Sequence, residues 1–396
     1  MKDKYKLVPI HKIGKVITGK TPSTSVQQYY NGEYMFITPA ELHDGYDIRF
    51  SEKTITEAGL NSIKTNSIDG TSVLVGCIGW DMGNVALCHK KCATNQQINS
   101  ITEFKPEYNP YYTYYWLSLK KKYLFSIASV TRTPILSKSS FEEIIIPMPE
   151  IEIQNLVVGV LRAIDEKILL NKRICSELEA MAKTLYDYWF TQFDFPNEDG
   201  KSYRSSGGEM VWNEQLKRKI PKGWTSDKIG NLLAKIPNTT RILTKDYSNA
   251  GSIPVIDQSA NFIAGYTDDK TALLSAESGY IVFGDHTRIV KYVRFPFARG
   301  ADGTQILKTN TDYIPDELLY QIVKSVDLSN YGYARHFKFL KDTLTFVPDN
   351  QVGQKYAKIV QGAFEKQSHL IFENMELTKL RDWLLPMLMN GQATVV

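Results

Sequence analysis

Two segments of the chain show the periodicity of long amphipathic helices. The first runs from about Gln154 to Phe190 and the second from about Gln351 to Asn390. Apolar side chains recur in both at alternating spacings of four and three, which is typical of a helix that packs along a partner helix. The seam positions are Val157, Leu161, Ile164, Ile168, Asn171, Cys175, Leu178, Ala182, Leu185 and Trp189 in the first segment, and Tyr356, Val360, Ala363, Leu370, Asn374, Leu377, Leu384 and Leu388 in the second.

A few residues interrupt or end these seams. Asn171 is a polar position in the first seam, where a buried amide can fix the register of two helices at some cost in stability. Gln367 and Arg381 interrupt the second seam. Pro386 should kink or weaken the last turns of the second helix, and Gly391 is a plausible C-cap.

The chain also shows one long internal repeat. The two helical segments match at an offset of about 200 residues, so that Gln154 aligns with Gln354. Further matches precede them in the same order: Lys12-Ile13-Gly14 with Lys228-Ile229-Gly230, Val73–Gly76 with Ile281–Gly284, and Ala93–Ile98 with Ala301–Ile306. Their common order predicts a duplicated unit of globular domain plus long helix.

Each globular part is rich in short β-branched runs broken by Gly, Asn, Asp and Pro, which indicates a mixed α/β fold with substantial sheet. Pro110–Lys120 and Asp316–Val326 look like short helices, and the polar, turn-rich stretch from Phe193 to Lys222 reads as a linker. The predicted organisation is a domain over 1–149, a central helix over 150–192, a linker over 193–220, a second domain over 221–349 and a C-terminal helix over 350–391.

Composition and charge set the class of protein but not its partner. The chain has 396 residues, of which 43% are apolar and 23% charged. This apolar fraction is enough to form hydrophobic cores, so the chain is not largely disordered. The net charge of +4 permits an anionic partner without requiring one. Four cysteines are no disulfide framework, and no apolar run reaches the length of a signal peptide or membrane helix. We therefore expect a cytoplasmic protein with no membrane association.

Short basic runs interleaved with aromatic or amide side chains suggest DNA binding at comparable points in the two halves. Lysine and arginine neutralise phosphates, while arginine, asparagine and glutamine can read base edges through paired hydrogen bonds. The alternative is a half-buried strand whose charged residues face water, notably at Lys291 and Arg294. The candidate DNA-binding residues are Asn95, Gln96, Gln97, Thr131, Arg132, Thr133 and Lys138 in the first half and Arg288, Lys291, Arg294, Arg335, His336 and Lys338 in the second.

Two motifs suggest other chemistry. Gly14–Thr21 matches the P-loop pattern, but a working P-loop needs a buried strand before it and a helix that opens at the Lys-Thr pair. Pro9 and His11 make a poor buried strand, and Pro22 follows at once. Cys88 and Cys92, with Cys77 nearby, lack the second ligand pair of a zinc site. We expect neither a bound metal nor a catalytic centre in this chain.

The sequence resembles the specificity subunit of type I restriction–modification systems along essentially its whole length. The resemblance is carried by several stretches together: Ile144-Ile145-Ile146-Pro147-Met148-Pro149, Ala163–Ile168, Leu178–Ala182, Tyr188-Trp189-Phe190 with Phe193-Asp194-Phe195, Ser205–Trp212, Ile220–Trp224 and Leu380–Pro386. Gly14–Thr21 falls where this family often has a Gly-Thr-Pro-Ser-like loop.

The resemblance implies a non-catalytic subunit with two target-recognition domains, each reading half of an asymmetric, split DNA site. It also implies that the two long helices pack antiparallel as a coiled coil and dock two methyltransferase subunits, which bring S-adenosylmethionine. Restriction subunits would bring ATP and Mg²⁺. The docking positions would be Val157, Leu161, Ile164, Ile168, Asn171, Leu178, Leu185, Trp189, Val360, Leu370, Leu377 and Leu384. Two other functions stay open from the residues alone: a P-loop nucleotide hydrolase with a coiled-coil arm, and a coiled-coil scaffold that binds no DNA.

Overall fold

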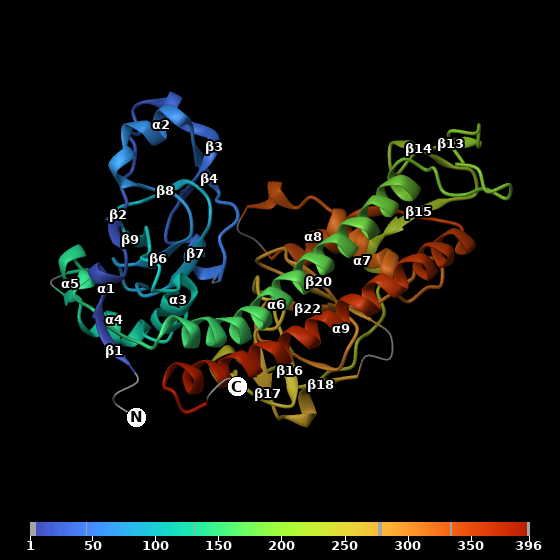
Figure 1. Cartoon of the computed structure of the whole chain (residues 1–396). Helices are drawn as coiled ribbons and strands as arrows, with labels where there is room; N and C mark the ends of the chain where they lie inside the picture. The colour runs from blue at the N-terminus through green and yellow to red at the C-terminus, as the bar shows by residue number, and fades with distance from the viewer. Residues whose placement is uncertain (1–4, 45, 131, 276–278, 333–334, 394–396) are drawn as a thin grey trace. The chain divides into compact units, whose positions relative to one another are not determined.

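The chain folds into two compact units, shown in Figure 1. The computed structural model describes residues 5–44, 46–130, 132–275, 279–332 and 335–393. One unit combines the chain up to Leu169 with the chain from Asn374 onward, and the other holds Leu170–Glu373. Both long helices therefore belong in part to each unit. We call these the first and the second unit.

In the first unit, two four-stranded sheets pack against each other. Their strand orders are β2-β9-β6-β7 and β4-β3-β8-β5. The strands are β2 Lys15–Thr18, β3 Tyr30–Ile37, β4 Lys53–Ile55, β5 Ser67–Ile68, β6 Ser72–Gly76, β7 Val85–Cys88, β8 Cys92–Thr94 and β9 Ile98–Thr102. Leu74 and Ala86 of one sheet and Ile37 of the other share a buried cluster between them. Because β6 is buried on both faces, it appears in the sequence as a continuous apolar run.

Helices cover the outer face of each sheet in the first unit. The face of β6 and β7 away from the second sheet packs on α3 and on the ends of the two long helices, while α2 packs on β3 and β4. The helices are α1 Ile10–Ile13, α2 Glu57–Ser62, α3 Pro110–Ser118, α4 Lys121–Ser126 and α5 Lys138–Glu142, and the remaining strands are β1 Lys6–Pro9, β10 Ser129–Val130, β11 Pro134–Ile135 and β12 Ile145–Met148. Strand β1 pairs antiparallel with β12, and β10 with β11.

The second unit repeats this plan. Its sheets have the orders β17-β16-β21-β18 and β20-β19-β22. The pair β16–β21 is parallel, as is β3–β8 in the first unit, and all the neighbouring pairs are antiparallel in both. The elements are β15 Thr225–Lys228, β16 Ile253–Ile256, β17 Gly265–Thr267, β18 Leu273–Leu274, β19 Tyr280–Gly284, β20 Val290–Val293, β21 Phe297–Arg299, β22 Thr304–Leu307, α7 Asp316–Ser325, α8 His336–Asp342 and β23 Leu344–Val347. Since β15 also pairs with β23 as β1 does with β12, the predicted duplication is present in these pairings. The exception is β2, in whose place the described part of the second unit has an isolated bridge between Leu233 and Thr309.

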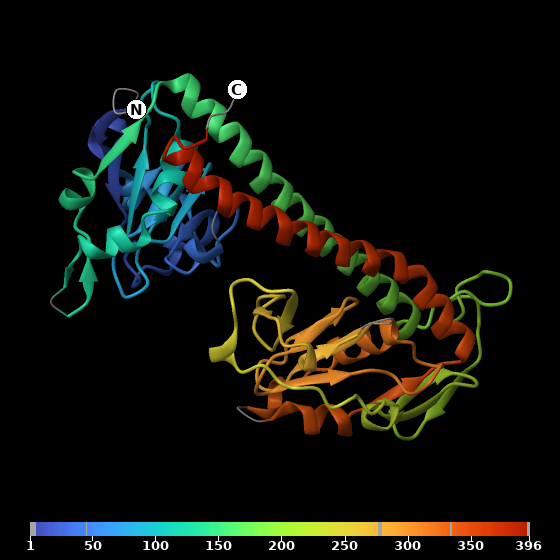
Figure 2. The same ribbon diagram turned by 90° about the horizontal axis from the view of Figure 1, so that it is seen from below.

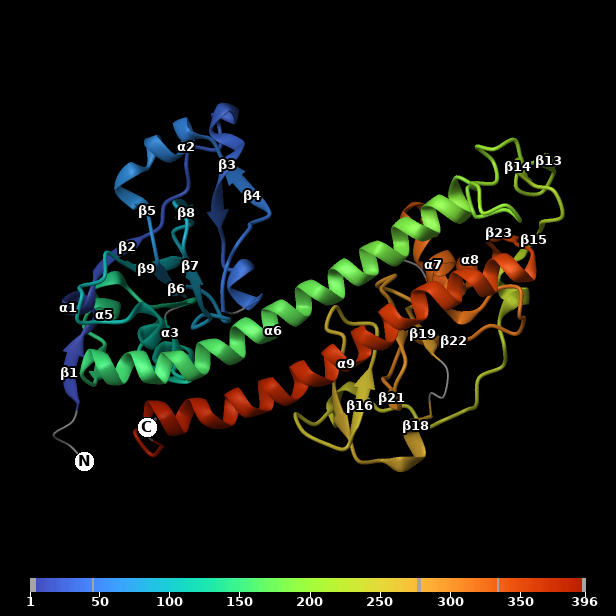
Figure 3. The same ribbon diagram turned by 45° about the vertical axis from the view of Figure 1, so that its right-hand side comes forward.

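Two long helices run antiparallel within each unit, as Figures 2 and 3 show. They are α6, Ile151–Tyr186, which continues into a π-helical turn at Asp187–Thr191, and α9, Asn350–Met389. In the first unit Asn374 Nδ2 donates to the Ile168 carbonyl (3.3 Å). In the second unit Tyr356 Oη donates to the Ala182 carbonyl (3.0 Å). Pro386 lies inside α9, and Gly391 follows the helix with φ +67°, in agreement with its predicted role as a cap.

Two details differ from the sequence-based expectations. Strand register aligns Ala93 with Ala298, because each faces the last but one residue of its parallel partner strand and the first residue of its antiparallel partner strand. The match of Ala93–Ile98 with Ala301–Ile306 is therefore wrong. The stretch expected as a linker over 193–220 is ordered: it contains the hairpin of β13 Met210–Asn213 and β14 Arg218–Pro221, and it places Phe193 and Phe195 in the core of the second unit.

Candidate nucleic-acid interface

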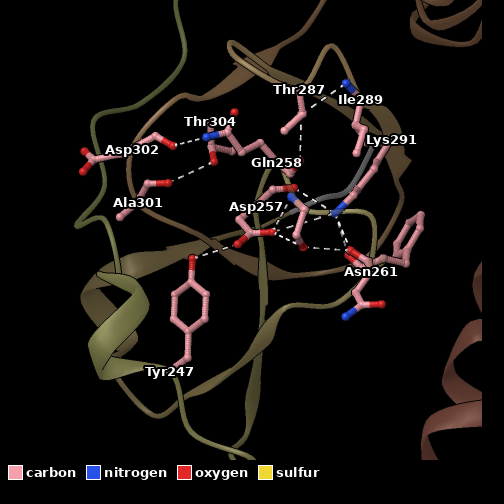
Figure 4. A network of polar contacts seen from close by, with 12 residues as sticks. Tyr247, Asp257, Gln258, Asn261, Thr287, Ile289, Lys291, Ala301, Asp302 and Thr304 are labelled. Atoms are coloured by element: carbon pink, nitrogen blue, oxygen red, sulfur yellow. Dashed lines mark hydrogen bonds and ion pairs between the residues drawn. The ribbon is translucent and has the colours of Figure 1, made fainter. Parts of the chain in front are cut away.

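Three loops meet at one edge of the second unit, and Gln258 joins them (Figure 4). They follow β16, connect β19 to β20, and connect β21 to β22. The Gln258 side chain accepts a hydrogen bond from the His286 amide (3.1 Å) and donates to the Asp302 carbonyl (2.9 Å). Thr287 Oγ1 donates to the Gln258 carbonyl (2.7 Å). These bonds hold the three loops as one surface.

Lys291 fixes the first of these loops from inside the unit. Its ammonium donates to the carbonyls of Asp257 (2.8 Å) and Asn261 (2.5 Å), and the Asp257 carboxylate lies 4.0 Å away (Figure 4). Its side chain is only 4% exposed, so the expectation of a solvated strand charge is wrong at this position. Burial lowers the pKa of Lys291 to about 8, although Asp257 acts in the opposite direction.

The other second-half candidates divide into two groups. Arg288, exposed with φ +61°, lies in the β19–β20 turn. His336 is buried, and its backbone amide and Nδ1 both donate to the Asp285 carbonyl (2.9 Å each). Exposed Arg335 and Lys338 flank this anchor, so they share the edge with Arg288. Arg294 does not: it faces α9 and lies 3.5 Å from the Glu317 carboxylate and 3.3 Å from that of Glu365.

The same edge exists in the first unit, built from matching backbone bonds. The Cys77 amide donates to the Gln97 carbonyl (2.7 Å), as the Asp285 amide does to that of Gly303 (2.6 Å). The Leu136 amide donates to the Cys77 carbonyl (2.8 Å), as the His336 amide does to that of Asp285 (2.9 Å). The structure therefore brings 95–97 and 132–138 together, and 288 and 335–338 likewise.

The first-half candidates differ in how available their side chains are. Asn95 and Gln97 are half-buried and bond to each other, with Asn95 Nδ2 donating to Gln97 Oε1 (3.0 Å). Gln96 and Arg132 are exposed. The remaining candidates have mixed positions: Thr133 is half-buried, Lys138 lies 3.6 Å from the Glu142 carboxylate on α5, and Thr131 falls outside the described residues.

The twelve predicted docking positions on the long helices are all buried or half-buried within the chain's own units. They form the seam between α6 and α9 and its contacts with the sheets. Large exposed apolar side chains lie elsewhere on these helices, and the seam pattern did not single them out. They are Ile153, Leu156, Leu380 and Trp383 in the first unit and Leu170, Met181, Ile359 and Phe372 in the second.

The alternative chemistry finds little support in the geometry. The P-loop match contains β2, which pairs with β9, and residues 19–26 after it form no helix. Cys88 and Cys92 have their sulfurs 3.6 Å apart and buried. Within the described part of the chain, no group of three or more metal-ligating side chains gathers. No described helix is both long and apolar enough to cross a membrane.

One exposed residue at the first unit's edge escaped the sequence reasoning. Trp80, 71% exposed, stands at the tip of the loop between β6 and β7. Gly79 and Gly83 on either side both have positive φ, 103° and 92°. A glycine pair around an aromatic residue signals a tight turn that displays a ring, and this signal could have been found in the sequence.

Known proteins share both the sequence pattern and the fold. A family model described as the type I restriction modification DNA specificity domain matches residues 2–180. The type I restriction enzyme MjaIX specificity subunit of Methanocaldococcus jannaschii is 28% identical over 98% of this chain and 93% of its own length. The HindI specificity subunit of Haemophilus influenzae is 32% identical over 43% of this chain and 38% of its own.

Among solved structures, the crystal structure of a type I restriction–modification S subunit from M. genitalium has a TM-score of 0.57. It covers 97% of this chain and 96% of its own, at 16% identity. That similarity confirms the mixed α/β fold with a long central and a long C-terminal helix.

Proposed function

The chain belongs to the specificity subunits of type I restriction–modification systems, which recognise DNA sequence, and from this premise we propose that each unit reads one half of a split, asymmetric site. The observation that supports this most is the three-loop edge built twice on the same strands. The backbone bonds of the two edges match, whereas their exposed side chains differ. Two similar but non-identical readers require two different half-sites, unlike the palindrome that a symmetric dimer reads.

Exposed cations at each edge supply the contacts. Arg132 in the first unit and Arg288 and Arg335 in the second are exposed, and a guanidinium group can read guanine or bind phosphate through paired hydrogen bonds. Gln96 adds an exposed amide for a base edge, and Lys138 and Lys338 add point charges for phosphates. Lys291 and His336 act beneath the surface: they hold the loops, and their own polar groups face inward.

The chain's other partners are the remaining subunits of the system. We propose that two methyltransferase subunits dock on the long helices and supply S-adenosylmethionine chemistry, and that restriction subunits supply ATP-driven translocation with Mg²⁺. The seam residues are occupied within the chain, so the docking contacts belong to exposed apolar side chains such as Trp383 and Leu380 on α9 and Met181 on α6. Exposed aromatic and aliphatic anchors are the usual centres of such interfaces.

Footprinting of the assembled complex on its methylated genomic site tests the split-site proposal. Two separate protected stretches are expected, and one continuous stretch contradicts it. Arg132→Ala should relax sequence preference in one half-site only, and Arg288→Ala in the other. Each loss is about 1–3 kcal/mol if the guanidinium makes a paired contact to a base. Lys217→Ala is the control that removes one positive charge elsewhere, because Lys217 lies exposed on the β13–β14 turn and belongs to none of the three loops of the second unit's edge.

A further inference from the structure

The three loops at the first unit's edge enclose a hollow of about 320 Å³. Apolar groups, among them Ile78, Met82 and Trp80, line part of it. Polar side chains line another part: the amides of Asn84 and Gln97, the imidazole of His43 and the carboxylate of Asp81. A concave site of apolar walls with a few polar groups is typical of a pocket that takes a planar organic group.

Trp80 is held in place at the rim of this hollow. Its neighbour Asp81 accepts a hydrogen bond from Lys121 Nζ (2.7 Å) and lies 2.8 Å from His43 Nε2. The bond from Lys121 holds the pKa of Asp81 below its usual range. Phe125, one helical turn after Lys121 on α4, places its ring 6.1 Å from the Trp80 ring. The loop therefore presents an exposed indole that is already fixed in position, which lowers the entropy lost on binding.

The polar groups around the hollow can both donate and accept. Lys121 Nζ donates to Asn84 Oδ1 (2.8 Å), and Asn84 Nδ2 donates to the Asp81 carboxylate (3.3 Å). The two contacts set the orientation of that amide and leave the second lone pair of its oxygen for a ligand. Gln97 is held by Asn95. Oriented amides of this kind can make the paired hydrogen bonds that distinguish one base edge from another.

The second unit fills the corresponding space. By strand register Gln258 occupies the position of Pro39, two residues after the matched residues Ile256 and Ile37. Its side chain bridges the neighbouring loops, as Figure 4 shows. Lys291 occupies the position of Ala86, since each faces the third residue of β19 or β6. Ala86 belongs to the buried cluster between the sheets and not to the lining of the hollow. The hollow is thus a feature of the first unit, in which small and apolar residues stand where the second unit has long polar ones.

We propose that this hollow takes one base that is unstacked from the DNA half-site read by the first unit, with Trp80 stacked on its face and the Asn84 and Gln97 amides at its edge. The proposal rests on the proposed function. Aromatic side chains supply stacking to an unpaired base in place of its neighbours in the duplex, and base extrusion is easiest where pairing is already weak. Arg132, on the hairpin bonded to Gly79 through the Pro134 carbonyl (3.0 Å), lies beside the site to hold the backbone.

The test measures dissociation constants of the chain assembled with its methyltransferase subunits, on its cognate duplex. An abasic site or a mismatch is placed in turn at each position of the first half-site. At one position the abasic site should weaken binding by about 5- to 100-fold, because stacking is lost. A mismatch there should strengthen binding, because no base pair has to be broken. Both effects should disappear in Trp80→Ala and persist in part in Trp80→Phe.

A mismatch at the base that is extruded for methylation would also strengthen binding. That effect does not depend on Trp80, so it should be equally large in Trp80→Ala. Trp212→Ala is the matched control, since Trp212 is exposed on β13 of the second unit. If Trp80→Ala binds as tightly as the wild type, or if mismatches weaken binding throughout the half-site, the base-binding inference is overturned. If Trp80→Ala does not fold, Gln97→Leu is tested in the same way. Binding as tight as that of the wild type would again overturn the inference. If the wild-type complex protects no split site, the proposed function itself is wrong.

Discussion

Asp165 on α6 and Arg381 on α9 form an ion pair within the first unit, with 2.9 Å between Oδ1 and Nη1. The second oxygen of Asp165 accepts a hydrogen bond from the Tyr115 hydroxyl (2.7 Å). The Asp165 side chain is only 3% exposed, so both of its oxygens depend on these partners. Arg381, which interrupts the apolar seam of α9, is thereby explained as the partner of a buried carboxylate.

Removal of the cation alone should be costly. Arg381→Met leaves the Asp165 charge buried beside a single hydroxyl, and we expect the free energy of unfolding of the first unit to fall by about 3–5 kcal/mol. Amide hydrogen exchange, followed separately for the two units, measures this loss of stability. Replacing both residues, as Asp165→Leu with Arg381→Met, should recover much of the loss. Lys15→Met is the control: it breaks an exposed pair with Glu103 (2.7 Å) and should change stability by less than about 1 kcal/mol.

The matched glutamines Gln154 and Gln354 allow a comparison across the repeat. Both donate to a carbonyl of the loop before α3 or α7, that of Glu107 (3.1 Å) or Asp312 (2.7 Å). Gln154 is fully buried and also accepts from the Asn109 amide (2.8 Å). Gln154→Met should therefore cost about 2–3 kcal/mol because it leaves buried groups unpaired, and Gln354→Met about 1 kcal/mol or less. Equal losses in denaturant unfolding would contradict this account.

Lys291 predicts a pH dependence of the second unit. Its folded pKa of about 8 lies below the ordinary value of 10.5. Between these values the unfolded chain carries a proton that the folded chain has released, so stability should rise with pH over that window. Relative to Lys291→Met, the wild type should gain up to about 3 kcal/mol from pH 8 to pH 10.5. A difference between the two proteins that stays constant with pH would show that the ammonium is not buried.

Substitutions at two glycines with positive φ distinguish the cost of backbone strain from the cost of a steric clash. Gly70 (φ +72°) has open space where a Cβ would lie, whereas a Cβ on Gly83 (φ +92°) would meet Lys121 Cγ at 2.9 Å. Gly70→Ala should cost about 1 kcal/mol from strain alone. Gly83→Ala should cost more, and it should weaken DNA binding at the first half-site because it displaces the loop that holds Trp80. Thermal unfolding and half-site binding measure the two effects.

The sequence predicted the long helices closely, because an apolar seam repeated over many turns leaves few alternatives. The expected start and end of the second helix, Gln351 and Asn390, each lie one residue from those of α9. The alignment of the two halves was correct at Gln154 and Gln354, because both residues belong to these regular helices. The alignment of Ala93 was wrong, because residue identity does not reveal strand register and the loop after β21 is one residue longer than the loop after β8.

The edge itself was only partly predictable. Runs of basic and aromatic residues pointed to the segments around Arg132 and Arg335, which the fold does place at matching strand ends. They could not reveal that Lys291 turns inward, because its partners are backbone carbonyls of a loop some 30 residues away, which no side-chain pattern records. The basic and aromatic runs also did not single out Trp80. Its ring is exposed because Gly79 and Gly83 turn the loop with positive φ and because Phe125 of α4 packs beside it.

The division of the chain between the units has a consequence for its synthesis. Leu170–Glu373 is one continuous stretch, whereas the first unit needs both its N-terminal part and the residues from Asn374 onward. The second unit therefore has all of its residues once Glu373 has been made, whereas the first unit still lacks the part of helix α9 that carries Arg381 and Leu385. A chain truncated after Glu373 should thus keep every residue of the second unit and leave Asp165 of the first unit without its cation.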